Sequence, residues 1–243
     1  MLRMSIAAAI ASLLLPVAGF GTPIWDFAND FTPSANPNTF WSYGYRTTPA
    51  STDLTLMNWN PHLDNIDFWA LSGWVELKRF FANGLPSIGK NNTPSAQPFW
   101  WPIVPPGKGI LHPGNVPEIE DLAAVVRWRA PSSGVYEVDA TFTAIDTRGV
   151  DVFTYVVADG GLVFDDFVVG LGDTSHYRGA VTLSAGQVVD FVVANRNDTG
   201  NRDWTQLDAS ITPIPEPSTL IIWSLLGALG MAAGWWRRRK RAA

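Results

Sequence analysis

Apolar and polar residues alternate with a period of two from residue 123 onward, which is the pattern of half-buried β-strands. In the segment 123–130, Val126 and Trp128 fall on one side, and Arg127 and Arg129 fall on the other. Segments of the same character follow at 135–143, 150–158, 162–169, 180–183, 187–195 and 204–212. No amphipathic helical pattern interrupts them, so this half of the chain is predicted to form antiparallel strands.

Turn signals separate these segments. Asp159-Gly160-Gly161 predicts a hairpin, because glycine supplies the positive φ angles that tight hairpin turns need. Residues 25–115 are rich in Pro, Asn, Gly and aromatics, with short predicted strands at 40–45 and 54–59. The segment 68–81 suits a helix or a strand, and we favour a strand. The expected fold class is all-β, an antiparallel jelly-roll β-sandwich.

The two ends of the chain differ from this body. Arg3 followed by the apolar run 6–15 and by small residues predicts a secretory signal peptide over residues 1–20. At the other end, 17 uncharged residues at 220–236 precede the basic run 237–241. An apolar run of about 17–25 residues is long enough for a transmembrane helix, and the basic run is expected on its cytoplasmic side. The sandwich domain at 21–212 is then expected outside the membrane.

Pro215, Glu216 and Pro217 stand immediately before the apolar run. This motif, the hydrophobic helix and the terminal basic cluster resemble, in that order, the C-terminal sorting signal of bacterial PEP-CTERM proteins. The resemblance covers residues 213–243 and implies recognition by an exosortase, cleavage near the motif, and delivery to the cell surface or extracellular matrix. The alternative is an ordinary helix that anchors the chain in the membrane.

Charge and cysteine content restrict the function of the body. Both predicted ends together hold six of the 17 basic residues and one of the 22 acidic residues, which leaves the body with a net charge of −10. Nucleic acid is therefore a poor partner, because phosphate binding needs a basic face. The chain has no cysteine, which excludes disulfides, thiolate nucleophiles and cysteine metal sites.

Aromatic residues are the strongest sequence indication of binding. Nine of the 12 tryptophans lie in the body, and sugar rings stack on indole faces. Phe99, Trp100 and Trp101 form a cluster in a proline-rich loop, where burial of all three rings is difficult. We predict these residues and Trp59 as glycan-binding candidates. The alternative for each ring is packing in a hydrophobic core.

Acidic residues suggest calcium more than catalysis. Calcium takes six to eight oxygen ligands, and Glu118, Glu120 and Asp208 are the candidates for a structural site. The acidic pairs Asp146 with Asp151, 165–166 and 203 with 208 have the composition of solvated turns, although a glycosidase also needs two carboxylates. No Gly-x-Ser-x-Gly motif occurs. We predict no catalytic residues and no enzyme activity.

A second resemblance covers most of the body. It is carried by the segments 36–38, 41–44, 111–114, 124–128, 131–136, 151–152, 185–191 and 203–208. Together they are similar to a jelly-roll module of exported PEP-CTERM proteins and, in outline, to non-catalytic carbohydrate-binding modules. The resemblance implies a cell-envelope or extracellular protein that binds or organises extracellular polysaccharide. The alternatives are a structural matrix or adhesin-like protein that contacts other proteins and, third, a glycoside hydrolase.

Overall fold

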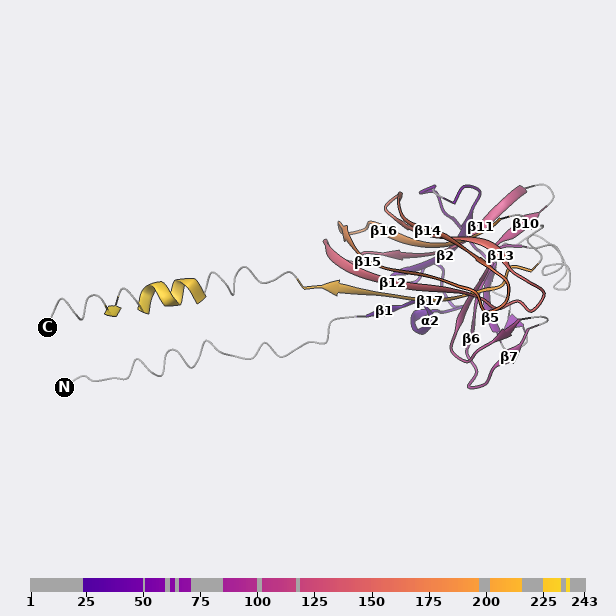
Figure 1. Ribbon diagram of the computed structural model, residues 1–243, viewed down its shortest axis with the longest axis horizontal. Helices are drawn as coiled ribbons and strands as arrows, with labels where there is room; N and C mark the ends of the chain where they lie inside the picture. Colours follow the sequence, from indigo (N-terminus) through magenta and orange to yellow (C-terminus); the bar gives the residue numbers. More distant parts are fainter. Residues whose placement is uncertain are drawn as a thin grey trace.

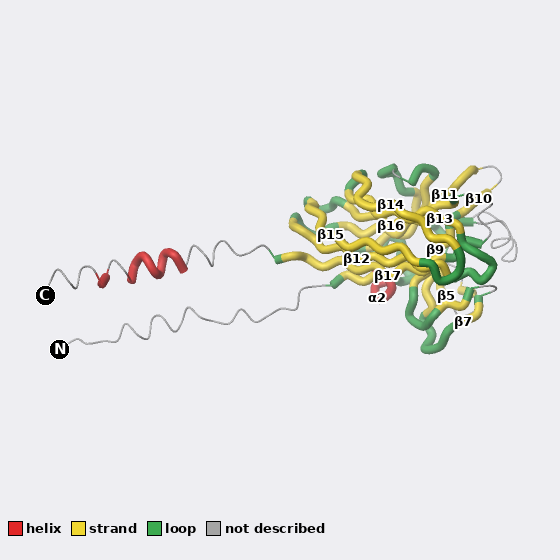
Figure 2. The backbone as a smooth tube through the Cα atoms, viewed as in Figure 1, coloured by secondary structure: helices red, strands yellow, loops and turns green. Residues whose placement is uncertain are grey.

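A computed structural model of the chain describes residues 24–49, 51–59, 62–63, 66–70, 85–99, 102–116, 119–196, 202–215, 225–232 and 235–236. In these residues, β-strands dominate and form two large sheets, both antiparallel, that are stacked in layers (Figures 1 and 2). The short helix α2 (Phe27–Asp30) directly follows the first strand, β1 (Trp25–Asp26). The prediction of an antiparallel β-sandwich is therefore confirmed, while the predicted signal peptide at 1–20 lies outside the described residues.

The first sheet, sheet A, has eight strands. Their order is β15 (Thr174–Leu183), β12 (Gly134–Ala144), β17 (Thr205–Ile214), β9 (Gly109–His112), β6 (Ser87–Asn91), β5 (Ile66–Ala70) and β4 (His62–Leu63), with β1 (Trp25–Asp26) also paired to β17. Sequence neighbours such as β12 and β13 (Asp151–Ala158) lie in different sheets, so the chain crosses repeatedly between the layers.

The second sheet, sheet B, has seven strands, and a separate two-stranded hairpin stands apart from both sheets. The order in sheet B is β14 (Gly161–Val169), β13 (Asp151–Ala158), β16 (Val188–Asn195), β11 (Ile119–Arg129), β2 (Trp41–Arg46) and β3 (Thr55–Leu56), with β10 (Gly114–Val116) paired to β11. The hairpin consists of β7 (Gln97–Pro98) and β8 (Ile103–Val104).

The predicted hairpin at residues 159–161 is confirmed. Ala158 pairs with Gly161, which leaves Asp159 and Gly160 as a two-residue connection between β13 and β14. Their φ angles are +47° and +82°, and two positive φ angles are the property of a type I′ turn. The turn sets the register next to it, and an irregularity between Val156 and Val157 then shifts the pairing by one residue, which brings Phe153 opposite Phe167.

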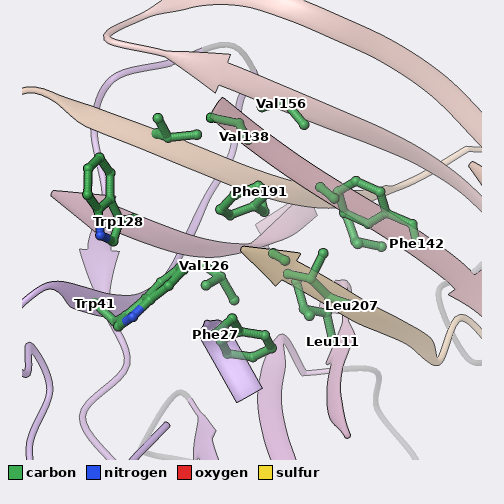
Figure 3. Close-up of a cluster of buried hydrophobic side chains, with 14 of the residues drawn as sticks. Phe27, Trp41, Leu111, Val126, Trp128, Val138, Phe142, Val156, Phe191 and Leu207 are labelled. Carbon is green, nitrogen blue, oxygen red and sulfur yellow. The ribbon is translucent and has the colours of Figure 1, made fainter. Parts of the chain in front are cut away.

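The main hydrophobic core lies between the sheets (Figure 3). Val126 and Trp128 of β11 point into it together with Trp41 and Phe191 from sheet B. Phe142 of β12 enters from sheet A, and the five side chains are fully buried. The alternation in segment 123–130 therefore assigned the inner face of β11 correctly.

A second core lies on the opposite face of sheet A. Leu111 belongs to the main core, whereas its neighbour Ile110 belongs to the second one, because successive residues of a strand point to opposite faces. The other members of this cluster are Ile66, Phe68, Phe99, Val104, Ile145 and Trp204. The β7–β8 hairpin supplies Val104, so the proline-rich part of the chain covers this end of the sheet.

Residues 225–232 and 235–236, within the segment predicted to span a membrane, are helical. Across the described residues, the structure contains no helix with the length and apolar character of a membrane span. The remainder of the predicted helix at 220–236, and the basic run at 237–241, lie outside the described residues.

Candidate functional site

Phe99 does not lie where the sequence analysis expected it. Its ring is 1 % exposed and packs in the second core, with ring centroids 5.1 Å from Phe68 and 5.2 Å from Trp204. Trp204 in turn lies 4.7 Å from the His112 ring. A ring enclosed in this way offers no face to a sugar. The prediction of Phe99 as a binding residue is corrected, because sheet A has a hydrophobic outer face here that the loop must cover.

The other predicted aromatic candidates are only partly described. Trp59 is half-buried in an isolated bridge after β3. Trp100 and Trp101 lie outside the described residues, so their role as glycan-binding residues stays a prediction.

The predicted calcium ligands do not come together in the described residues. Asp208 lies on the outer face of sheet A, where its carboxylate accepts hydrogen bonds from Lys108 Nζ and Gln206 Nε2, both at 2.7 Å. Glu118 and the side chain of Glu120 lie outside the part of the chain that the structure describes. Among described residues, no group of three or more His, Asp or Glu side chains is arranged to hold a metal ion. Calcium therefore stays a prediction.

Among the sorting residues, only Pro215 is described, as an exposed residue directly after β17. Glu216 and Pro217 lie outside the described part of the chain, so the sorting motif stays a prediction.

Two of the acidic residues considered for catalysis, Asp146 and Asp203, are buried and have structural partners. Asp146 is fully buried and forms a salt bridge of 3.0 Å with Arg148. Asp203, also fully buried, accepts a hydrogen bond of 3.0 Å from the backbone N–H of Asp151. These two carboxylates fix the turn between β12 and β13 and the entry to β17.

A group of aromatic residues lies on the outer face of sheet B. Val152 and Val156 of β13 point into the main core, so Phe153 and Tyr155 point outward. Phe167 of β14 is directly opposite Phe153, and Asp165 is directly opposite Tyr155. Side chains directly opposite in an antiparallel pair lie on the same face. We call the outward set Asp151, Phe153, Tyr155, Asp165, Phe167 and Arg196 the aromatic strip.

Arg196 links the rings of the strip. Its guanidinium carbon lies 4.3 Å from the centroid of Phe167 and 5.7 Å from that of Phe153. Its Nη1 donates to the Asp151 carboxylate at 2.8 Å, and its backbone N–H donates to the Asp151 carbonyl oxygen at 3.2 Å. The cation–π contacts and the ion pair hold the guanidinium beside the rings, with further N–H groups available to a ligand.

The strip offers both apolar and polar contacts at the surface. Phe167 is 46 % exposed, and the Phe153 and Tyr155 ring centroids are 6.0 Å apart at an interplanar angle of 36°. Burial raises the pKa of the Tyr155 phenol, and the Asp165 charge raises it further, so the hydroxyl stays protonated and can donate a hydrogen bond. The strip therefore combines ring faces, two types of donor and carboxylate acceptors.

The loop between β2 and β3 borders the strip on the side of β11. Leu54 and Tyr155 pack against outward apolar residues of sheet B, which are Ala123, Val125, Val157, Val192 and Ala194. Beneath this loop, Asp190 binds both Arg46 and Arg127, whose guanidinium groups also donate to the carbonyl oxygens of Ser51 and Thr52. The loop is thus fixed to the sheet, and the floor next to Tyr155 is preformed.

Sequence reasoning missed the strip although one signal was available. In the segment 150–158, Phe153 and Tyr155 fall on one face of the strand, and Val152 and Val156 fall on the other. Either the two aromatic rings or the two valines therefore had to point outward. Which face is covered depends on the other sheet. The register that adds Phe167 and Asp165 depends on the hairpin turn and on the irregularity between Val156 and Val157, and the position of Arg196 depends on the pairing of β16.

Comparison with known proteins gives structural neighbours only. No protein family profile matches the chain, and no curated protein matches it. One similar solved structure contains CBM51-2 in complex with GlcNAc and INT domains from Clostridium perfringens ZmpB, with 18 % identity, 40 % of this chain covered, 23 % of that chain covered and a TM-score of 0.30. This chain therefore spans less than a quarter of the length of that neighbour.

Two further neighbours are isolated modules. A family 35 carbohydrate binding module from Clostridium thermocellum is 17 % identical over 38 % of this chain and 72 % of that chain, with a TM-score of 0.28. The CBM51 from Clostridium perfringens GH95, in complex with methyl-galactose, is 18 % identical over 44 % and 74 %, with a TM-score of 0.28. TM-scores this low do not establish a shared fold, so the assignment of the sandwich rests on its strand pairing.

Proposed function

We propose that this chain is an exported, non-catalytic protein whose jelly-roll sandwich binds extracellular polysaccharide through the aromatic strip. The observation that carries the proposal is the exposed ring of Phe167 beside the Arg196 guanidinium, on a face that also presents Tyr155 and Asp165. Sugars present C–H faces to aromatic rings and hydroxyl groups to charged side chains, and the strip supplies both kinds of partner. A strand-borne surface also suits an extended polymer, because its side chains are held in fixed positions by the sheet.

The electrostatics of the strip favour a neutral polymer. The Arg196 charge is matched by Asp151, and Asp165 adds a further negative charge. Since the predicted exported body carries a net charge of −10, a strongly anionic polymer would be repelled. Calcium belongs to the proposal as a structural ion of the body, with Glu118, Glu120 and Asp208 as the ligands expected from the sequence.

Phe167→Ala is expected to weaken polysaccharide binding about tenfold, which corresponds to about 1.4 kcal/mol for the loss of one ring contact. The measurement is calorimetric or pull-down binding of the full-length chain to the producing organism's extracellular polysaccharide, with and without calcium. Ile103→Ala is the matched control, because Ile103 is 59 % exposed on β8, away from the strip.

Unchanged binding by the Phe167 variant would remove the strip from the proposal. Absence of binding by the native chain, together with concentration-dependent self-association, would favour a structural matrix protein instead. An effect of calcium on affinity or melting temperature would support the ion, whereas identical results with a chelator would count against it.

The C-terminal segment is proposed to direct sorting by an exosortase, with the helix at 220–236 as a transient membrane anchor. Changing Glu216 and Pro217 together to alanine is expected to leave the full-length chain unprocessed and retained in the membrane fraction. Immunoblotting of membrane and extracellular fractions measures this, with a Ser210→Ala variant as the control within β17. Normal processing of the double variant would contradict a role for the motif.

A further inference from the structure

A cavity of about 360 Å³ lies at the corner formed by β1, α2 and the start of β2. Its walls include Trp25, Phe40 and Trp41, and its polar lining includes Asp30, Thr32 and Asn38. This volume falls in the range of about 300–1,000 Å³ that is usual for small-molecule sites. The cavity involves none of the residues of the aromatic strip.

The aromatic wall of this cavity is held in place by the fold. Trp25 is tied to β17 through its pairing with Ile211, and its ring packs 5.1 Å from Trp128 and 5.8 Å from Phe40. Trp41 is fully buried in the main core, and its Nε1 donates to Asp30 Oδ2 at 3.0 Å. A ligand would therefore meet the half-buried Phe40 ring and the exposed Asp30 carboxylate, both already positioned.

The polar groups of the cavity differ in how many hydrogen bonds they can still form with a ligand. The Asn38 side chain donates to the Asp30 carbonyl oxygen and to the Tyr43 hydroxyl, and its Oδ1 accepts from the backbone N–H groups of Phe40 and Trp41. The Thr32 hydroxyl is bonded to Ser34 at 2.6 Å. What remains for a ligand is chiefly an acceptor, Asp30.

Asp30 retains one oxygen for a ligand. Its Oδ2 accepts from Trp41 Nε1 and from the Asp26 backbone N–H, whereas Oδ1 accepts no hydrogen bond from the described residues. The Asp26 carboxylate, nearby in the chain, is bound to the Asn29 N–H. In the described part of the chain, neither carboxylate forms a salt bridge with Lys, Arg or His. The corner therefore carries uncompensated negative charge next to aromatic rings.

We propose that this cavity binds an ammonium-bearing sugar, a 2-amino-2-deoxyhexose unit, with its ammonium group at Asp30 Oδ1. An ammonium ion forms a charge-assisted hydrogen bond with a carboxylate and is also attracted to the faces of aromatic rings. The half-buried ring of Phe40 provides the surface for the C–H face of the sugar. The positive charge of the ligand follows from the cavity itself, whereas the choice of a sugar over another organic ammonium ion rests on the proposed function.

The experiment compares four probes on the full-length chain by saturation-transfer NMR and calorimetry, below the pKa of the amine. These are glucosamine, glucose, N-acetylglucosamine and tetramethylammonium. Glucosamine is expected to bind at least about tenfold more tightly than either neutral sugar, because only its ammonium group forms the ion pair. Equal affinity for glucose and glucosamine would overturn the role of the ammonium group. An affinity for tetramethylammonium equal to that for glucosamine would overturn the choice of a sugar as the ligand.

Two variants locate the binding. Asp30→Asn is expected to weaken glucosamine binding about tenfold, because it removes the charge while its side-chain oxygen still accepts from Trp41. Asp166→Asn, an exposed acidic residue of β14, is the matched control. Thr39→Arg places a cation at the exposed rim without touching the core and is also expected to abolish binding. Native affinity in both the Asp30 and the Thr39 variants would overturn the proposal.

The two sites can be tested separately. Asp30→Asn should leave the affinity measured through the aromatic strip unchanged, and Phe167→Ala should leave glucosamine binding unchanged. If the Phe167 variant loses polymer binding but the native chain does not bind glucosamine, the cavity alone is overturned. If the native chain binds glucosamine but the Phe167 variant keeps its polymer binding, the strip alone is overturned.

Discussion

Replacing Asp190 with asparagine is expected to lower the free energy of unfolding by about 3–5 kcal/mol, because it leaves buried cations without their counter-charge. The Asp190 side chain is 2 % exposed, and its carboxylate receives Arg46 Nη1 at 3.0 Å and Arg127 Nε at 2.7 Å. The Arg46 side chain is equally enclosed. Burial lowers the pKa of Arg46, and the Asp190 charge opposes this effect. Without the carboxylate, the burial of the guanidinium group is no longer compensated.

Urea denaturation of the full-length chain measures this change. The matched control is Glu137→Gln, which breaks the Arg178–Glu137 pair on the outer face of sheet A. Those side chains are 60 % and 41 % exposed, and a pair of this kind contributes about 0–1 kcal/mol. Similar losses of unfolding free energy in both variants would show that the buried cluster stabilises the protein no more than an exposed ion pair does.

The Asp190 variant has a second expected consequence, for binding. The same two arginines donate to the carbonyl oxygens of Ser51 and Thr52, and so fix the loop whose Leu54 packs beside Tyr155. Loss of Asp190 should therefore loosen the border of the aromatic strip as well as the sheet.

Phe99→Ala is expected to destabilise the protein by about 3–5 kcal/mol, the usual cost of removing a buried phenylalanine ring. The ring contacts Phe68 and Trp204, and it lies in a core formed by the outer face of sheet A, the β7–β8 hairpin and the connecting residues Ile145 and Trp204. Gly89 lies below Phe68, where a Cβ would come within 2.4 Å of the ring, so the site is already tightly packed. The neighbouring backbone therefore has little freedom to fill the cavity.

Chemical denaturation and polysaccharide binding together test this prediction. Phe167→Ala serves as the control, because the Phe167 ring is 46 % exposed and its loss should cost little stability. The expected pattern is opposite in the two variants: Phe99→Ala loses stability and, while folded, retains affinity, whereas Phe167→Ala loses affinity and retains stability. A folded Phe99 variant without polysaccharide affinity would restore the sequence prediction for that residue.

The sequence predicted the strands of the second half well, because the period of two is a local property. The strand at 123–130 and the hairpin at 159–161 follow from side-chain type and from the φ angles that glycine permits. Strand β15 was underestimated at its start, since Thr174 to Arg178 lack a continuous apolar face. They form a strand because β12 provides paired backbone groups as far as Thr143.

The outward side of these strands was predicted less well. Arg127 faces away from the main core as expected, but it is not simply solvated, since the loop after β2 covers it and Asp190 lies opposite on β16. In the same way, Phe99 was expected at the surface because its loop is rich in proline. Whether a loop residue is exposed depends on the surface below it, which local sequence does not describe.

The sequence by itself determined that this chain forms antiparallel strands, where the clearest turns lie and which side of β11 faces the main core, because these features depend on neighbours within a few residues. The tertiary structure alone decided that sheet A carries a second core over Phe99, that Asp190 joins two arginines, and that Phe167 and Arg196 meet Phe153. The physical reason is that these contacts join residues from separate strands or loops, and strand order and register set them.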